Sequence, residues 1–331
     1  MIEHNDFESI EKNIQDQIEK KIEDYIIAKE PVSLYEPFKY IMAGGGKRIR
    51  PTLAMLSAGA VGGKPEDALN SGVAIEILHN FTLAHDDIMD RSLMRRNRPT
   101  IHVKWNEAVA ILTGDVMVGC AYELLPSPEI NKNTYKIQRE FSKGLIEVCE
   151  GQAYDMDFNT LQYVSLDQYI LMITKKTARL LEASAVIGGL CGTGTDEQVD
   201  SLRCFANSLG IAFQIQDDLL DLTANQAELG KTIGQDIVEG KKTFFIIKAS
   251  ELATEKADKD LLEIFYKENG LSQDHVQAMK EMFSRLGIYD IAQNTIEDYL
   301  NHAKSELAKL PDNQYTKMLV RITDKLNKRN K

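Results

Sequence analysis

Two acidic clusters with the same internal spacing are the residues of this chain best suited to chemistry. Their members are Asp86, Asp87 and Asp90 in the first cluster and Asp217, Asp218 and Asp221 in the second. Each cluster ends an apolar run of helical pattern, and a helix that turns about 100° per residue brings the first and last carboxylates onto one face. Crowded carboxylates repel unless a cation lies between them, and oxygen ligands without His or Cys suit Mg²⁺. One such motif is usually a solvated helix face, but two copies predict a metal site.

Cationic side chains accompany both clusters. Arg95 and Arg96 follow the first cluster, and Lys231 and Lys241 follow the second. Arginine and lysine placed beside metal-binding carboxylates favour a polyanionic ligand, because the cations and the metal ions neutralise the same charge. The simplest ligand of this kind is a diphosphate.

A third basic group, Lys47, Arg48 and Arg50, follows three consecutive glycines. Glycines do not continue a helix cheaply, so these cations are expected on a loop before the helix that Pro51 starts. Cations on a glycine-rich loop beside a helix start suit phosphate oxygens. Taken alone, however, such a segment is more often a solubilising basic loop.

Composition limits the class of protein. The chain has 331 residues, of which 43% are hydrophobic, and a net charge of −11. This length allows one large helical domain or two ordinary ones. The negative charge argues against a nucleic-acid partner and against adhesion to anionic lipid, so an anionic substrate must be held by local cations.

The cysteines and the N-terminus indicate the cellular compartment. The four cysteines are widely spaced, without a CxxC pair, and are expected to be buried thiols in a reducing cytoplasm. The acidic start of the chain does not fit a signal peptide, and no stretch reaches the ~18 apolar residues of a spanning helix. We therefore expect a cytoplasmic enzyme without a stable membrane anchor.

Apolar residues recur at helical spacing along almost the whole chain, with no strand alternation. Helices are expected over about residues 7–29, 34–42, 51–60, 65–90, 108–125, 135–158, 165–189 and 196–221. Residues 224–242 are polar and punctuated by glycines, which is typical of a lid over a bound ligand. Further amphipathic helices are expected after Phe244, broken near Gly270, Gly287 and Pro311.

These motifs resemble those of trans-type prenyl diphosphate synthases, and most closely the archaeal short-chain geranylgeranyl type. In the family's order they are Gly45-Gly-Lys-Arg-Ile-Arg-Pro51, His85-Asp-Asp-Ile-Met-Asp90, Lys176-Thr177, Phe213-Gln-Ile-Gln-Asp-Asp-Leu-Leu-Asp221 and Gly230-Lys231. The resemblance covers roughly residues 35–245. It implies an all-α isoprenoid synthase fold, in which about ten or more helices surround a deep central cavity as a single domain over residues 1–331, and it implies a homodimer.

The resemblance also assigns substrate-binding residues around the first cluster. Isopentenyl diphosphate is assigned to Lys47, Arg50, His79 and Arg96, and the allylic diphosphate to Arg95. Arg48 receives no firm assignment, and His85 is expected to support the cluster structurally. Asn97 stands where the family usually has Gly, and because Asn also tolerates a left-handed conformation, the turn is expected to be kept.

Around the second cluster, the resemblance assigns contact with the allylic diphosphate to Lys176, Lys231 and Lys241. Thr177 is expected to steady developing positive charge, and Gln214 to face the reacting carbons rather than the metals. Lys175 is expected to point away, since two adjacent lysines cannot both face inward. The remaining expected neighbours of the site are Gln152, Asp155, Asp236 and Lys242.

The implied reaction is the condensation of isopentenyl diphosphate with dimethylallyl, geranyl or farnesyl diphosphate. The resemblance implies three Mg²⁺ per active site, which hold the allylic diphosphate while it leaves and an allylic cation forms. A terpene cyclase normally lacks the second Asp cluster, and a non-catalytic subunit of a heteromeric synthase is expected to have lost one cluster. A calcium-binding module needs an acidic loop with a central Gly that this chain lacks.

Product length depends on side chains that precede the first cluster. In the family, an aromatic residue five positions before the first Asp resembles the archaeal geranylgeranyl type, and Phe81 is that residue. Thr82 stands where animal farnesyl synthases have a second aromatic residue. On an ideal helix Thr82 lies about 40° from Asp86 and Phe81 about 140°, so Phe81 blocks the path only if its ring swings across. A twenty-carbon product is expected, with a fifteen-carbon or mixed product as the alternative.

Overall fold

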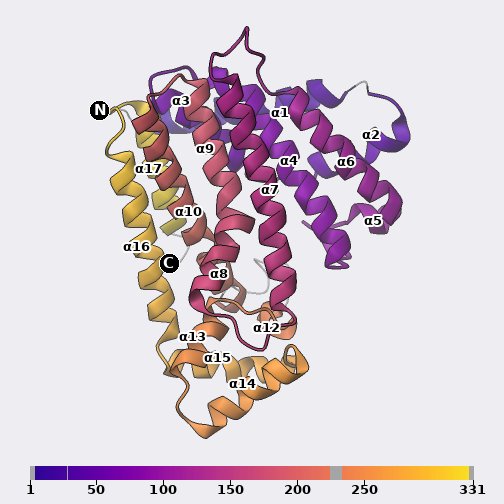
Figure 1. The fold of residues 1–331 in the computed structure, drawn as a ribbon, viewed down its shortest axis with the longest axis vertical. Helices are drawn as coiled ribbons and strands as arrows, with labels where there is room; N and C mark the ends of the chain where they lie inside the picture. Colours follow the sequence, from indigo (N-terminus) through magenta and orange to yellow (C-terminus); the bar gives the residue numbers. More distant parts are fainter. Residues whose placement is uncertain (1–3, 28, 224–232, 328–331) are drawn as a thin grey trace. The chain divides into compact units, whose positions relative to one another are not determined.

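The computed structural model describes residues 4–27, 29–223 and 233–327 (Figure 1). Apart from one two-stranded hairpin, the regular structure of these residues is helical. The described residues group into two compact units. The first lies within Met1–Leu145, Leu180–Cys204 and Glu306–Ile322, and the second within Ile146–Arg179, Phe205–Ser305 and Thr323–Lys331.

The first unit begins with seven helical elements and the hairpin. They are α1 (His4–Ile26), α2 (Val32–Met42), α3 (Ile49–Ala60), η1 (Pro65–Ala68), α4 (Leu69–Met89), β1 (Met94–Arg95), β2 (Arg98–Pro99), α5 (Ile101–Lys104) and α6 (Glu107–Glu123). Most of α9 (Arg179–Cys191) also belongs to this unit, together with the first parts of α7 (Thr134–Phe158), α10 (Asp196–Thr223) and α17 (Gln314–Asn327).

Helices α3 and α4 form the core of the first unit. Every residue of α3 from Pro51 to Ala60 is buried, and α4 is buried from Ser71 to Leu78. Such helices need neighbours on all sides, and α1 supplies one by burying Ile14, Ile18, Ile22 and Ile26. Helix α9 approaches α3 so closely that a Cβ on Gly188 would lie 2.1 Å from the carbonyl oxygen of Ala54.

The second unit contains the remaining helices. They are the rest of α7, α10 and α17, together with α8 (Leu166–Ile173), η2 (Thr174–Ala178), α12 (Gln235–Val238), α13 (Phe244–Leu252), α14 (Lys256–Glu268), α15 (Gln273–Arg285) and α16 (Ile288–Leu307). The last residues of α16 belong to the first unit. An aromatic cluster on α13, α15 and α16 forms part of its core, where Phe245 packs against Phe283 and Tyr289 with ring centroids 5.7 and 5.5 Å apart.

The predicted helix over residues 165–189 is interrupted by one turn of π-helix, η2. Gly151 of α7 allows this turn to pass close by, because a Cβ there would lie 2.3 Å from the backbone nitrogen of Lys176. π-Turns inside helices occur often at functional sites, and η2 carries the Lys176-Thr177 motif.

The all-α class is confirmed, with several corrections of detail. The hairpin was not expected, because its two-residue strands are too short to show alternation. The predicted helix at 65–90 begins as the 3₁₀ turn η1, and α1 ends at Ile26 rather than near residue 29. Cys149 and Cys204 are exposed, so the expectation of four buried thiols was wrong, although all four cysteines are free. None of the described helices has the length and apolar character needed to cross a membrane.

Candidate active site

The first aspartate cluster lies at the C-terminal end of α4. Asp87 is only 3% exposed, whereas Asp90 is exposed and ends the helix. Arg95 on β1 donates from Nε to Oδ1 of Asp87 over 2.8 Å. Burial raises the pKa of Asp87, while the charge and hydrogen bond of Arg95 oppose that rise. The buried carboxylate therefore has a cation from its own unit as a partner.

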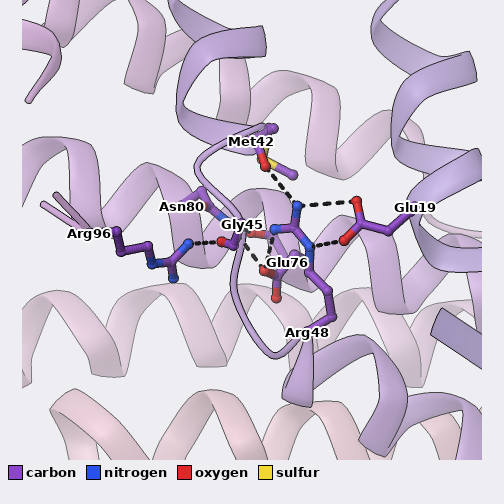
Figure 2. A network of polar contacts seen from close by, with 7 residues as sticks. All are labelled: Glu19, Met42, Gly45, Arg48, Glu76, Asn80 and Arg96. Carbon is purple, nitrogen blue, oxygen red and sulfur yellow. Dashed lines mark hydrogen bonds and ion pairs between the residues drawn. The ribbon is translucent and has the colours of Figure 1, made fainter. Parts of the chain in front are cut away.

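The hairpin separates the two arginines that follow the cluster. Arg96 and Asn97 form its two-residue turn with φ values of 52° and 59°, the left-handed pair that a type I′ turn requires. Asn97 thus adopts the conformation expected for it in place of Gly. While Arg95 contacts Asp87, the guanidinium of Arg96 donates to the carbonyl oxygen of Gly45 (Figure 2).

A cluster of basic groups surrounds the middle of α4. Nε of Arg50 is buried without a hydrogen-bond partner, and burial lowers the pKa of Arg50 to about 10. Burial and the charges of Arg50 and Arg96 hold the pKa of His79 well below its usual range, so this imidazole is neutral. Burial also lowers the pKa of Arg96. Lys47 is exposed on the glycine-rich loop. Such a concentration of positive charge, with an unpartnered donor, is suited to an anionic ligand.

The second aspartate cluster lines a cavity of about 250 Å³ within the second unit. Helices α7, α8, η2 and α10 and the segment from Asp236 to Thr243 supply its walls. The residues expected here that line the cavity are Asp155, Lys176, Thr177, Gln214, Asp217, Asp218, Asp221, Asp236, Lys241 and Lys242. The structure thus brings Asp155 of α7 into the same cavity as Lys242, at the end of the expected lid.

Asp218 is the most enclosed carboxylate of this cavity. It is 5% exposed and accepts hydrogen bonds from the Tyr169 hydroxyl at 2.6 Å, Gln214 Nε2 at 3.0 Å and the backbone nitrogen of Phe244 at 3.3 Å. Burial, reinforced by the charge of Asp236, raises the pKa of Asp218 to about 7. These three hydrogen bonds lower the pKa and so oppose the rise, but their donors carry no charge and they do not outweigh burial.

Gln214 lines the cavity and bonds two of its neighbours. Its nitrogen donates to Asp218, and its oxygen accepts from Thr177 Oγ1 at 2.8 Å, while its expected position facing the reacting carbons stays a prediction. Gln214 therefore links the Lys176-Thr177 motif to the acidic cluster. The spacing of four residues between Gln214 and Asp218 on one helix explains the contact.

Lys176 and Lys241 of the cavity are paired with carboxylates, whereas Lys242 donates to Asn269 Oδ1 at 2.9 Å. Lys176 lies 2.5 Å from Asp155, and Lys241 lies 3.1 Å from Asp236 and 2.9 Å from Glu239. Lys175 bonds Glu150 instead and does not line the cavity, as the sequence predicted. Lys231 lies outside the described residues, as does the first part of the expected lid, residues 224–232.

Several cavity residues were not found by sequence reasoning. They are Phe158, Asn159, Tyr169, Met172, Ile173 and Thr243. Tyr169 is the most consequential, because its hydroxyl contacts Asp218 across 49 residues of sequence. Within its apolar run it is indistinguishable from an ordinary core aromatic, so no local signal identified it. Gln152, expected at the cavity, is buried but does not line it.

The donor set fits a hard divalent cation that completes its coordination elsewhere. Both clusters offer carboxylate oxygens only, as Mg²⁺ prefers. Yet no three His, Cys, Asp or Glu side chains among the described residues gather closely enough to hold a metal ion. Mg²⁺ usually takes one or two carboxylates and draws its other ligands from water and substrate phosphate. The residues therefore suit a metal that binds together with a diphosphate.

Comparison with known proteins shows to which family the chain belongs. The family model for polyprenyl synthetase matches residues 31–283. The chain belongs to the polyprenyl synthetase family. It is thus a prenyltransferase, and the resemblance inferred from the motifs is confirmed. The geranylgeranyl diphosphate synthase of Methanosarcina mazei is 39% identical over 295 residues, which cover 89% of each chain.

Solved structures of polyprenyl synthetases share the fold. The geranylgeranyl pyrophosphate synthetase of Pyrococcus horikoshii Ot3 matches with a TM-score of 0.90 and 36% identity over 98% of each chain. The polyprenyl synthase of Caulobacter crescentus CB15, complexed with calcium and isoprenyl diphosphate, matches with a TM-score of 0.87 and 25% identity over 97% of this chain and 96% of that one. A divalent metal thus accompanies a diphosphate in a structurally similar protein.

Proposed function

We propose that this prenyl diphosphate synthase condenses isopentenyl diphosphate with an allylic diphosphate in a Mg²⁺-dependent reaction and makes mainly geranylgeranyl diphosphate. The observation that carries the proposal is the cavity of the second unit, where Lys176, Thr177 and Gln214 lie with the whole second aspartate cluster. The similarity to geranylgeranyl diphosphate synthases supports the twenty-carbon product.

The two substrates use different residues. Isopentenyl diphosphate is held by Lys47, Arg50, His79 and Arg96, where the unpartnered Nε of Arg50 offers a donor to phosphate. The allylic diphosphate is held by Arg95, Lys176, Lys231 and Lys241. Both aspartate clusters serve that diphosphate through the Mg²⁺ ions, three per site, and the chain works as one catalytic domain.

The chemistry needs charge stabilisation rather than a nucleophilic side chain. Mg²⁺, when bound, acts as a Lewis acid that favours departure of the allylic diphosphate. Lys176 and Lys241 add fixed positive charge near the leaving oxygens. The Thr177 hydroxyl donates a hydrogen bond to Gln214 Oε1. The lone pairs of the Thr177 oxygen therefore remain available to face the positive charge that develops on carbon. The double bond of isopentenyl diphosphate then attacks the allylic carbon to form the new carbon–carbon bond, and the released diphosphate accepts the proton that the condensed product loses.

Product length is set by Phe81. Its ring packs edge to face against His85, with centroids 4.7 Å apart, so its side chain is held against the helix turn that carries the first cluster. Thr82 bonds back to the carbonyl oxygen of His79 at 2.8 Å and adds little bulk. Phe81 is therefore the larger obstacle to a growing chain on this part of α4.

The outer face of α6 fits a homodimer interface. Ile111 and Leu112 are 46% and 58% exposed, and Tyr122 further along the helix is 37% exposed. Apolar side chains gathered on one exposed helix are typical of a surface that another chain covers. A second copy of this chain is the partner that we propose.

The decisive experiment is incubation with labelled isopentenyl diphosphate and each of dimethylallyl, geranyl and farnesyl diphosphate, with Mg²⁺ or with EDTA, followed by chromatography of the products. We expect Mg²⁺-dependent formation of mainly geranylgeranyl diphosphate from each primer. A product that stops at farnesyl diphosphate would correct the chain length. Absence of any condensation product with Mg²⁺, or equal activity in EDTA, would overturn the proposal.

A further inference from the structure

Arg48 of the glycine-rich loop is buried and makes four hydrogen bonds within the protein (Figure 2). Its Nε donates to Glu19 at 2.7 Å, Nη1 to Glu76 at 2.9 Å, and Nη2 to the Met42 carbonyl oxygen at 2.7 Å and to Glu19 at 3.3 Å. The side chain is 3% exposed. Four of the five N–H donors of a guanidinium are thereby used, so Arg48 cannot serve as a phosphate ligand as its neighbours do.

The contact with Met42 closes the glycine-rich loop into a ring. Met42 is the last residue of α2, and Arg48 precedes α3, so this one hydrogen bond joins the two ends of the loop. Arg48 adopts a left-handed conformation with φ of 46°, which is costly for a residue with a long side chain. The side-chain contacts of Arg48 are what maintain that conformation.

Two carboxylates from different helices hold Arg48. Glu76 on α4 is 3% exposed and is also contacted by Asn80 Nδ2 at 3.4 Å. Glu19 belongs to α1, next to the buried Ile18, and lies outside the residues that match the family model. Burial alone would lower the pKa of Arg48, but the bonds to Glu19 and the charge of Glu76 outweigh it and raise the pKa.

The ring supports the residues proposed to bind isopentenyl diphosphate. Lys47 and Arg50 flank Arg48 in the sequence. The Arg96 guanidinium donates a hydrogen bond to the Gly45 carbonyl oxygen of the ring. It also lies close to Gly46, where a Cβ would be 3.0 Å from Nη1 of Arg96. A shift of the ring would therefore displace a loop cation and the hairpin cation together.

We propose that Glu19, Arg48 and Glu76 form a positioning triad for the isopentenyl diphosphate site, which makes the N-terminal helix α1 part of the substrate-binding machinery. The inference rests on the proposed function. The triad touches no substrate. It fixes the loop in the conformation that presents Lys47, Arg50 and Arg96, so binding does not have to order them.

The test uses Glu19→Gln, which keeps the size of the side chain and removes its charge. Glu19 is half exposed, so this variant should fold. We expect the dissociation constant and the KM of isopentenyl diphosphate to rise about fivefold, because a charge-assisted contact of Arg48 is weakened. The KM of the allylic substrate and kcat should stay within about twofold.

A second arginine held by two glutamates provides the matched control. Arg203 donates to Glu140 at 3.1 and 3.3 Å and to Glu182 at 2.8 Å in the same unit. Glu140→Gln removes a comparable charge far from the glycine-rich loop in sequence. It should lower Tm about as much as Glu19→Gln and leave the binding of isopentenyl diphosphate unchanged.

A double-mutant cycle tests whether Glu19 acts through Arg48. In an Arg48→Lys background, which retains the charge but loses the planar fork, Glu19→Gln should change the dissociation constant by less than twofold. An undiminished effect there, unchanged binding in Glu19→Gln, or equal effects of Glu19→Gln and Glu140→Gln would each overturn the proposal. Calorimetric titration with isopentenyl diphosphate distinguishes a failure of the positioning triad from a failure of the proposed function. Absence of binding by the wild type would refute the proposed function itself.

Discussion

The two aspartate clusters share their spacing and bury the same middle member, but different groups hold that buried carboxylate in each cluster. Asp87 and Asp218 are 3% and 5% exposed. Asp87 faces the cationic Arg95, whereas the donors to Asp218 among the described residues, which include Tyr169 and Gln214, carry no charge. A repeated motif thus fixes which carboxylate is buried, while the surrounding residues decide how easily that carboxylate ionises.

The largest expected effect tests whether the clusters are both required. Asp86→Ala and Asp217→Ala should each lower kcat a hundredfold or more, on the order of other losses of transition-state charge stabilisation. Tm should stay unchanged or rise, because each change removes one of several crowded negative charges. Steady-state kinetics and thermal melts measure both quantities. Near-normal kcat in one variant would mean that the corresponding cluster is only a solvated helix face.

The next prediction concerns stability in EDTA. The folded pKa of Asp218 is about 7, against an ordinary value of 3.8, so the folded protein binds more protons than the unfolded chain between these pH values. Stability should therefore fall as pH rises from about 4 to 7, by as much as about 4 kcal/mol. Asp218→Asn should abolish that fall and be more stable than the wild type at pH 8.

Asp87→Asn is the contrasting variant. Arg95 opposes the rise in the pKa of Asp87, so this variant should raise the free energy of unfolding at pH 8 less than Asp218→Asn does. Denaturant titrations of both variants at pH 5 and pH 8 make the comparison. If the two asparagine variants behaved alike at pH 8, the difference that we draw between the clusters would be wrong.

The arginines of the hairpin sharpen the comparison further. Arg96→Lys should raise the KM of isopentenyl diphosphate about tenfold and that of the allylic substrate much less, since a point charge does not replace the planar fork. Arg95→Lys should show the opposite preference, because Arg95 is tied to the first cluster through Asp87. If Arg96→Lys raised the KM of the allylic substrate more than that of isopentenyl diphosphate, the substrates assigned to Arg95 and Arg96 would have to be exchanged.

Local patterns were sufficient to predict the helical class, the two clusters and the contrast between Lys175 and Lys176. They were sufficient because helix periodicity and residue spacing are properties of short segments. The left-handed turn at Asn97 was likewise expected from the residue type alone.

The features that sequence reasoning missed depend on long-range packing. The Tyr169 hydroxyl meets Asp218 only after α8 and α10 have folded together. The π-turn at Lys176 lies where Gly151 of another helix allows its close approach. Arg48 looked like its neighbours Lys47 and Arg50, and only its contacts with Glu19 and Glu76 distinguish it. Residue spacing alone does not predict which carboxylate, distant in the sequence, forms an ion pair with a buried cation.

The smallest expected change is one of product rather than rate. Phe81 lies five positions before Asp86, the first Asp of the first cluster. The corresponding residue before Asp217 in the second cluster is the buried Ala212. Phe81→Ala makes the first helix resemble the second at this position and should lengthen the main product by at least one isoprene unit, with kcat within a fewfold. Chromatography of the products decides it, and an unchanged product distribution would place the obstacle on another side chain.

The central claim is the proposal that both clusters, which offer the carboxylate oxygens that Mg²⁺ prefers, bind Mg²⁺ together with a diphosphate. Calorimetric titration with Mg²⁺, in the presence and absence of inorganic diphosphate, tests it most directly. We predict tight binding by the wild type only when diphosphate is present, and its loss in both Asp86→Ala and Asp217→Ala. Tight Mg²⁺ binding without diphosphate, or wild-type binding in either variant, would contradict the account.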